Sequence, residues 1–93
     1  MAKLIKTDGT EIEVAPKNPR KGFTCAELYK LIGCELVEPV GPNSKGELMI
    51  CDEMGKLNGS KVNQKATDWY WKSFGPYDVI VGNVVICDDK QFK

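Results

Sequence analysis

The chain has 93 residues, of which 42% are hydrophobic and 28% charged, close to the composition of an ordinary globular protein. Thirteen Lys and Arg balance thirteen Asp and Glu, so the net charge is zero and a basic nucleic-acid-binding surface is not expected. A chain of this length builds one modest core, and we therefore expect a single domain over residues 1–93.

The first residues, Met1 to Lys6, return to a charged side chain after only two apolar ones. This pattern lacks the apolar core of a signal peptide, and no later run is long enough to span a membrane. We therefore expect a cytoplasmic protein that has no contact with a membrane.

The side chains that usually carry chemistry are sparse. The chain has no histidine, and its four cysteines, at positions 25, 34, 51 and 87, include no Cys-x-x-Cys pair. A zinc site, another cofactor and a catalytic apparatus are therefore not expected. Cys51 and Cys87 each follow three apolar residues, which predicts buried free thiols in strands.

Two short segments rich in apolar and β-branched residues, 2–7 and 10–15, flank the pair Asp8-Gly9. An Asp-Gly pair in this setting is typical of a β-hairpin turn, so the chain is predicted to begin with two antiparallel strands. Residues 16–22 contain two prolines, a glycine and three basic side chains, and predict a loop.

A helix is predicted to begin after Thr24, because Thr24 and Glu27 have the spacing of a capping box. Gly33 can adopt the left-handed conformation that ends a helix. The face predicted to meet the core carries Cys25, Leu28, Leu31 and Ile32.

A second hairpin is predicted from the extended segments 36–40 and 47–52, because the residues between them include two glycines, a proline and an asparagine. The polar stretch 53–61 then predicts a loop that crosses to a second helix. That helix is expected to begin after Asn63 and to end at Gly75-Pro76.

One face of this second helix is predicted to pack on the sheet and carries Ala66, Trp69, Tyr70 and Phe74. Three consecutive aromatic residues span about 200 degrees of a helix, so they cannot all face one core. Trp71 lies off the apolar face and is predicted to be exposed.

Residues 77–87 are nearly all apolar, which predicts a strand that is either covered on both faces or bent at Gly82-Asn83, so that each half turns a different side inward. A bulge is the favoured interpretation of the Gly82-Asn83 pair itself. Residues 88–93 predict a polar tail. The order is therefore β-β-α-β-β-α-β, with the last strand whole or split in two. This order predicts an α+β fold in which two helices pack on an antiparallel or mixed sheet.

Residues 55–61 resemble a phosphate-binding loop in their glycines and their Ser-Lys pair, but the residue order differs and the spacing is one residue short. A plain connecting loop is the favoured interpretation. If this region does bind a ligand ahead of the helix, the contacts are expected to come from Lys56, Asn58, Lys61, Asn63 and Trp71.

Three strings, 50–59, 62–67 and 78–85, resemble a family of small proteins from phages, plasmids and bacteria, catalogued as domain of unknown function 3846. The resemblance covers nearly the whole chain and implies a setting in mobile elements, where short proteins often block host defences, but no activity. A phage-encoded member would act in the host cytoplasm. Among the matching residues, Leu57 and Ala66 are interpreted as packing residues, and the glycines as residues that the backbone geometry requires.

Two hypotheses compete for the function of a non-enzymatic binding protein. In the first, the protein is an anti-defence protein that sequesters a small nucleotide-like immune signal through the five residues above. In the second, it is an interaction module that docks on a host protein and inhibits or modulates it, and Trp71 and Tyr77 then matter more than the lysines. A homo-oligomer is compatible with either, because two-fold dimers often bind ligands at their interface.

Overall fold

The computed structural model describes residues 2–92. Its elements in chain order are the strands β1 (Ala2–Ile5) and β2 (Glu11–Val14), helix α1 (Cys25–Ile32), strands β3 (Val37–Val40) and β4 (Glu47–Asp52), helix α2 (Gln64–Phe74), strand β5 (Val84–Asp88) and a 3-10 turn, η1 (Asp89–Gln91). The predicted order β-β-α-β-β-α-β and the α+β class are confirmed. None of the described helices is long and apolar enough to cross a membrane.

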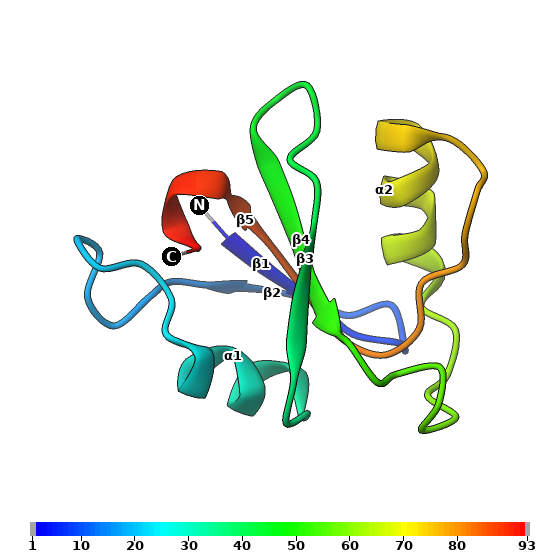
Figure 1. Cartoon of the computed structure of the whole chain (residues 1–93), viewed down its shortest axis with the longest axis horizontal. Coiled ribbons are helices and arrows are strands. Elements are labelled where there is room, and N and C mark those ends of the chain that lie inside the picture. Colours follow the sequence, from blue (N-terminus) through cyan, green and yellow to red (C-terminus); the bar gives the residue numbers. More distant parts are fainter. Residues whose placement is uncertain (1, 93) are drawn as a thin grey trace.

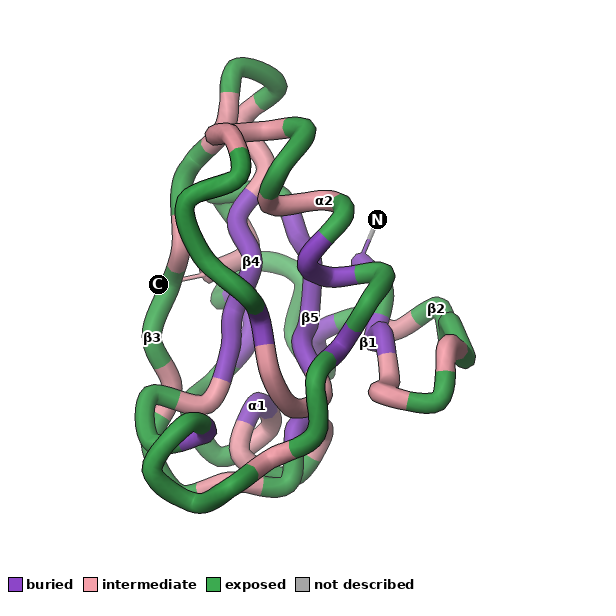
Figure 2. The backbone as a smooth tube through the Cα atoms, turned by 90° about the vertical axis from the view of Figure 1, so that its right-hand side faces the viewer, coloured by how far each residue is buried: buried purple, intermediate pink, exposed green. Residues whose placement is uncertain are grey.

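The five strands form one sheet in the order β2-β1-β5-β4-β3, with every neighbouring pair antiparallel. Helix α1 covers one face of the sheet and helix α2 the other (Figure 1). The last strand of the chain, β5, therefore lies at the centre. Figure 2 shows the buried residues gathered on β1, β5 and β4, whereas the edge strands β2 and β3 are largely exposed.

Each face of the sheet has its own apolar cluster, because successive side chains of a strand point to opposite faces. In β4, Leu48 and Ile50 belong to the cluster beneath α1, whereas Met49 and Cys51 belong to the cluster beneath α2. The continuous apolar runs of β4 and β5 follow from this arrangement, since both strands are covered by protein on both faces.

The ends of α1 are those that its sequence predicts. The Thr24 hydroxyl accepts the N–H of Glu27, the Glu27 carboxylate accepts the N–H of Thr24, and Gly33 is left-handed with φ of 81°. Cys25, which the sequence places on the buried face, is exposed. It is the first residue of α1, and the helix reaches the apolar cluster only one turn later, at Leu28.

The prediction of one apolar strand over residues 77–87 is wrong in its first half. Only Val84–Asp88 is a strand, and the preceding segment makes a single bridge, between Val81 and Val62. Gly82, with φ of 79°, turns the chain before β5 begins, so the alternative of a bend at Gly82-Asn83 is confirmed, although this turn is not a bulge within one continuous strand. The backbone of Ile80 bonds instead to residues of α2 and its cap.

The predicted polar tail is part of the fold as far as residue 92. Phe92 packs against the cluster beneath α1, and residues 23 and 92 form a parallel bridge. Gly22 permits this approach, because a Cβ at its position would lie 2.3 Å from the Gln91 carbonyl oxygen.

Candidate functional site

Two surface hollows are built by the same pair of segments, the loop 53–61 and the segment 75–83. The two segments are joined where the N–H of Gly82 donates to the Lys61 carbonyl at 2.8 Å and the N–H of Asn63 donates to the Ile80 carbonyl at 2.8 Å. Residues about twenty positions apart in the sequence are thereby brought side by side.

Asn63 fixes this junction from inside the protein, where its side chain is 0% exposed. Its Oδ1 accepts the N–H of Ala66 at 3.1 Å and so caps α2. Its Nδ2 donates to the carbonyls of Ile5 at 3.0 Å and Gly82 at 2.9 Å. One side chain therefore ties together the end of β1, the start of α2 and the segment before β5.

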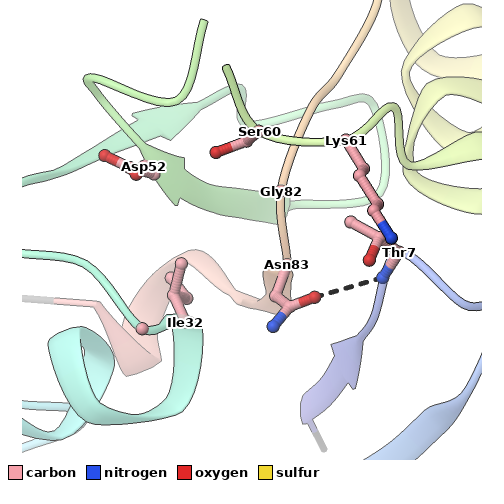
Figure 3. A pocket seen from close by; sticks show the side chains of 8 residues that line it. Thr7, Ile32, Asp52, Ser60, Lys61, Gly82 and Asn83 are labelled. Carbon is pink, nitrogen blue, oxygen red and sulfur yellow. Dashed lines mark hydrogen bonds between the residues drawn. The ribbon is translucent and has the colours of Figure 1, made fainter. Parts of the chain in front are cut away.

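The first hollow, which we call the polar hollow, lies at the end of the sheet where α1, β4 and the two segments meet (Figure 3). It has a volume of about 220 Å³. The residues that line it are Thr7, Ile32, Gly33, Asp52, Ser60, Lys61, Gly82 and Asn83.

One hydrogen bond within the polar hollow sets the orientation of the Asn83 amide: Oδ1 accepts the N–H of Thr7 at 3.1 Å. The Nδ2 of Asn83 faces away from that bond (Figure 3). Among residues 2–92, this nitrogen, the Lys61 ammonium and the hydroxyls of Thr7 and Ser60 have no intramolecular hydrogen-bond partner. The hollow therefore presents several donors that remain available to a ligand or to water.

The second hollow, which we call the apolar groove, also has a volume of about 220 Å³ and lies beside α2. Its apolar lining comes from β3, β4, α2 and both segments, and consists of Val40, Cys51, Leu57, Tyr70, Val79, Ile80 and Val81. Its charged lining consists of Glu38, Glu53, Lys56 and Asp78.

Large exposed apolar side chains stand on and beside this groove. Leu57 and Val79 line it and are 80% and 40% exposed, respectively. Tyr77, which is 81% exposed, precedes Asp78 in the sequence. Trp71, which is 46% exposed, lies beside Asp78 in space, since its Nε1 donates to the Asp78 carbonyl at 2.7 Å. The exposure predicted for Trp71 is confirmed.

An ion pair between Lys56 and Asp78 fastens the loop to the segment across the groove. The hydrogen bond from the Lys56 ammonium, together with one from the N–H of Val79, holds the pKa of Asp78 below its usual value. Lys56 is therefore engaged by a carboxylate within the protein and is not a free cation.

The loop 53–61 uses most of its own backbone donors. The N–H groups of Gly55, Asn58, Gly59 and Ser60 donate to carbonyls at or within the loop, and the N–H of Met54 donates to the Asp52 carboxylate. A phosphate-binding loop works by pointing such groups at its ligand. The favoured interpretation of this segment as a connecting loop is therefore supported by its hydrogen bonds.

Residues 2–92 match the family model described as Domain of unknown function (DUF3846). The chain belongs to this DUF3846 family. The resemblance noted in the sequence is thereby confirmed, and the match includes both segments that build the two hollows. Comparison with curated proteins finds no match, and neither does comparison with solved structures.

In this DUF3846 chain, the five residues expected to bind a ligand do not converge. Lys61 lines the polar hollow, Lys56 lines the apolar groove, and Asn58 lines a third hollow of about 450 Å³ beside residues 33–36. Trp71 lies beside the apolar groove, and Asn63 is buried with its side-chain atoms bonded to the protein, which gives it a structural role.

The sequence also misjudged or missed several residues of these sites. Leu57 is interpreted from the sequence as a packing residue but is one of the most exposed large apolar residues, whereas Ala66 is buried, as a packing residue should be. Thr7 and Val79 were not anticipated at all, because only the tertiary structure brings them to the hollows. Asp52 belonged to the family motif, and that motif was the one signal that could have marked it.

The cysteine in the apolar groove is not suited to act as a nucleophile. Burial, together with the nearby carboxylates of Glu38 and Asp52, raises the pKa of Cys51 to about 12. A thiol is reactive as its thiolate, which hardly forms near neutral pH at such a pKa. Among residues 2–92, no group of three or more His, Cys, Asp or Glu side chains is placed to hold a metal ion.

Proposed function

We propose that this DUF3846 protein is a non-catalytic interaction module that docks on a partner protein through the apolar groove and its exposed rim. The rim consists of Leu57, Trp71, Tyr77 and Val79. The observation that carries the proposal is that these large exposed side chains gather at one groove. Exposed apolar patches of this kind often mark protein-binding surfaces, and Trp and Tyr are common anchors of such interfaces.

The charges of the groove favour a partner segment that is both apolar and basic. Among residues 2–92, three carboxylates and one ammonium group line the groove, and that ammonium group, of Lys56, is paired with Asp78. Among the described residues, Glu38 and Glu53 form no ion pair. Complementary charge across an interface speeds association and selects the partner.

Side-chain docking is favoured over addition of a strand to the edge of the sheet. β3 is an edge strand beside the groove, and it contains Pro39, which lacks an N–H. A proline removes one donor that an incoming strand would need, and edge prolines commonly block such pairing. The partner would therefore be held by apolar side chains in the groove and by basic ones at its acidic margin.

The first hypothesis, a nucleotide-like immune signal, has weaker support. Its five contact residues lie in different places, and one of its lysines is neutralised by Asp78. The mobile-element setting implied by the resemblance suggests instead that the partner is a host protein of the cytoplasm.

A random peptide display library selected against the purified protein tests this function. Selected peptides are expected to combine large apolar residues with Lys or Arg, and to bind less tightly as salt is raised. Leu57→Ser and Tyr77→Ala should each weaken binding about tenfold or more. Glu53→Gln should weaken it less and reduce the salt dependence.

The matched control is Ile12→Ser, because Ile12 is 40% exposed on β2, far from the groove in the order of strands. This variant should bind the selected peptides as the unchanged protein does. Failure to enrich any peptide, enrichment of acidic peptides, or equal binding by the Leu57→Ser variant would overturn the proposal.

A further inference from the structure

The polar hollow has a distribution of charge that the protein-docking function does not use. Asp52 lies on one side of the hollow, whereas Lys61 and Thr7 lie on the other, and the hollow separates them (Figure 3). The two opposite charges line the same small space but form no ion pair with each other among the described residues. An opposite pair held apart in this way is complementary to a ligand that itself carries both charges.

The Asp52 side of the hollow favours a cation. The C-terminal end of α1, at Ile32 and Gly33, forms part of the same wall. The C-terminus of a helix carries partial negative charge, which adds to that of the carboxylate. One oxygen of Asp52 accepts the N–H of Met54 at 2.9 Å, and the other remains available for an ammonium group.

The opposite side favours an anion. The Lys61 ammonium, the Nδ2 of Asn83 and the Thr7 hydroxyl are all donors without an intramolecular partner among residues 2–92. The amide of Asn83 cannot easily reverse, because its Oδ1 already accepts the N–H of Thr7. A carboxylate can accept several such hydrogen bonds at once, and those from charged donors are the strongest.

The size of the hollow suits a small molecule. Its volume of about 220 Å³ lies below the range of about 300–1,000 Å³ typical of pockets for drug-sized ligands. The neighbouring hollow of about 450 Å³ shares Gly33 and Asp52 with it and is partly lined by Leu36 and Met54. An apolar side chain on the ligand could therefore extend past Asp52 without leaving the protein surface.

The geometry points to a binding site for a small zwitterion of the amino-acid class in the polar hollow. The ammonium group of the ligand lies against Asp52, and its carboxylate accepts hydrogen bonds from Lys61, Asn83 and Thr7. This site shares no lining residue with the apolar groove, so a test of one proposal does not decide the other.

Nuclear magnetic resonance titration of the whole protein tests the site with leucine and two analogues that each lack one charge. These are 3-methylbutylamine, which lacks the carboxylate, and 4-methylpentanoate, which lacks the ammonium group. Leucine is expected to bind with a Kd of about 1 mM or tighter, and each analogue about tenfold more weakly. The shifted amides should be those of the residues that line the hollow, including Gly33, Ser60 and Gly82.

Two variants test the roles of the charges. Asp52→Asn keeps an oxygen for the Met54 N–H while removing the negative charge, and Lys61→Met keeps the aliphatic stem of the side chain. Each should weaken leucine binding about tenfold, whereas Lys45→Met, in an exposed turn that does not line the hollow, should not. Equal affinity for leucine and its analogues, or unchanged affinity in both test variants, would overturn the inference. So would shifts confined to other parts of the protein.

Discussion

Replacing Asn63 with alanine tests the joint on which both hollows depend. The substitution removes the acceptor that caps α2 at Ala66 and both donors to the carbonyls of Ile5 and Gly82. None of these three bonds has an obvious replacement, because the side chain is 0% exposed. We therefore expect a loss of stability much larger than that of an ordinary polar substitution.

The magnitude follows from the three bonds. Loss of an Asn cap costs about 1 kcal/mol. A buried polar group left without its partner costs about 1–3 kcal/mol, and we take the low end for both carbonyls, that of buried Ile5 and that of half-buried Gly82. The sum is about 3 kcal/mol, which for a domain of this size lowers Tm by about 12–24 °C.

Urea unfolding followed by tryptophan fluorescence measures this change. A second variant, Asn63→Asp, separates the cap from the other two bonds. It keeps the oxygen that caps α2 but replaces the donor Nδ2 with a second oxygen, which faces the Ile5 and Gly82 carbonyls. At pH 7 it should be destabilised at least as much as Asn63→Ala. The control Asn58→Ala, at an exposed loop residue, should change the free energy of unfolding by less than about 0.5 kcal/mol. A loss below about 1 kcal/mol for Asn63→Ala, or a milder effect of Asn63→Asp, would refute the reasoning.

Two further predictions concern the cysteines and the first helix. In the folded protein a thiol reagent should modify exposed Cys25 first, whereas burial raises the pKa of Cys51 to about 12 and that of Cys87 to about 11. Peptide mass mapping after labelling near neutral pH should therefore find Cys25 modified long before Cys51 and Cys87. Labelling of Cys51 as rapid as that of Cys25 would contradict its burial. Thr24→Ala should lower the free energy of unfolding by about 1 kcal/mol in the same urea assay, because it removes the hydroxyl of the capping box. Thr24→Ser keeps a hydroxyl and should retain most of that stability. Equal stability of the two variants would rule out a capping role for the hydroxyl.

Local features of the sequence were reliable wherever the structure depends on neighbouring residues. The capping box at Thr24, the left-handed Gly33 and the Asp8-Gly9 hairpin are each decided by a few adjacent residues. The same is true of the Asn63 cap. The further bonds of Asn63 reach Ile5 and Gly82, which are 58 and 19 positions away, and no sequence pattern predicts these bonds.

The segment 77–83 shows where a sequence pattern and the tertiary structure diverge. Its apolar composition suits a strand, yet the backbone of Ile80 is bonded to Thr67 and Asn63 and is not available to a continuous ladder. Val79 and Tyr77 are left exposed as a result. Apolar composition alone cannot distinguish a buried strand from an exposed rim, because both use the same side chains.

By itself, the sequence determined the order of the elements, their caps and turns, and the family, because propensity, capping and motif are properties of short stretches of chain. The strand order, with β5 at the centre, was decided only by the tertiary structure. So were the dispersal of the five expected ligand residues over different hollows and the placement of Asp52 and Lys61 across one of them. These features depend on contacts between segments that are distant in the sequence, and no short stretch of chain encodes such contacts.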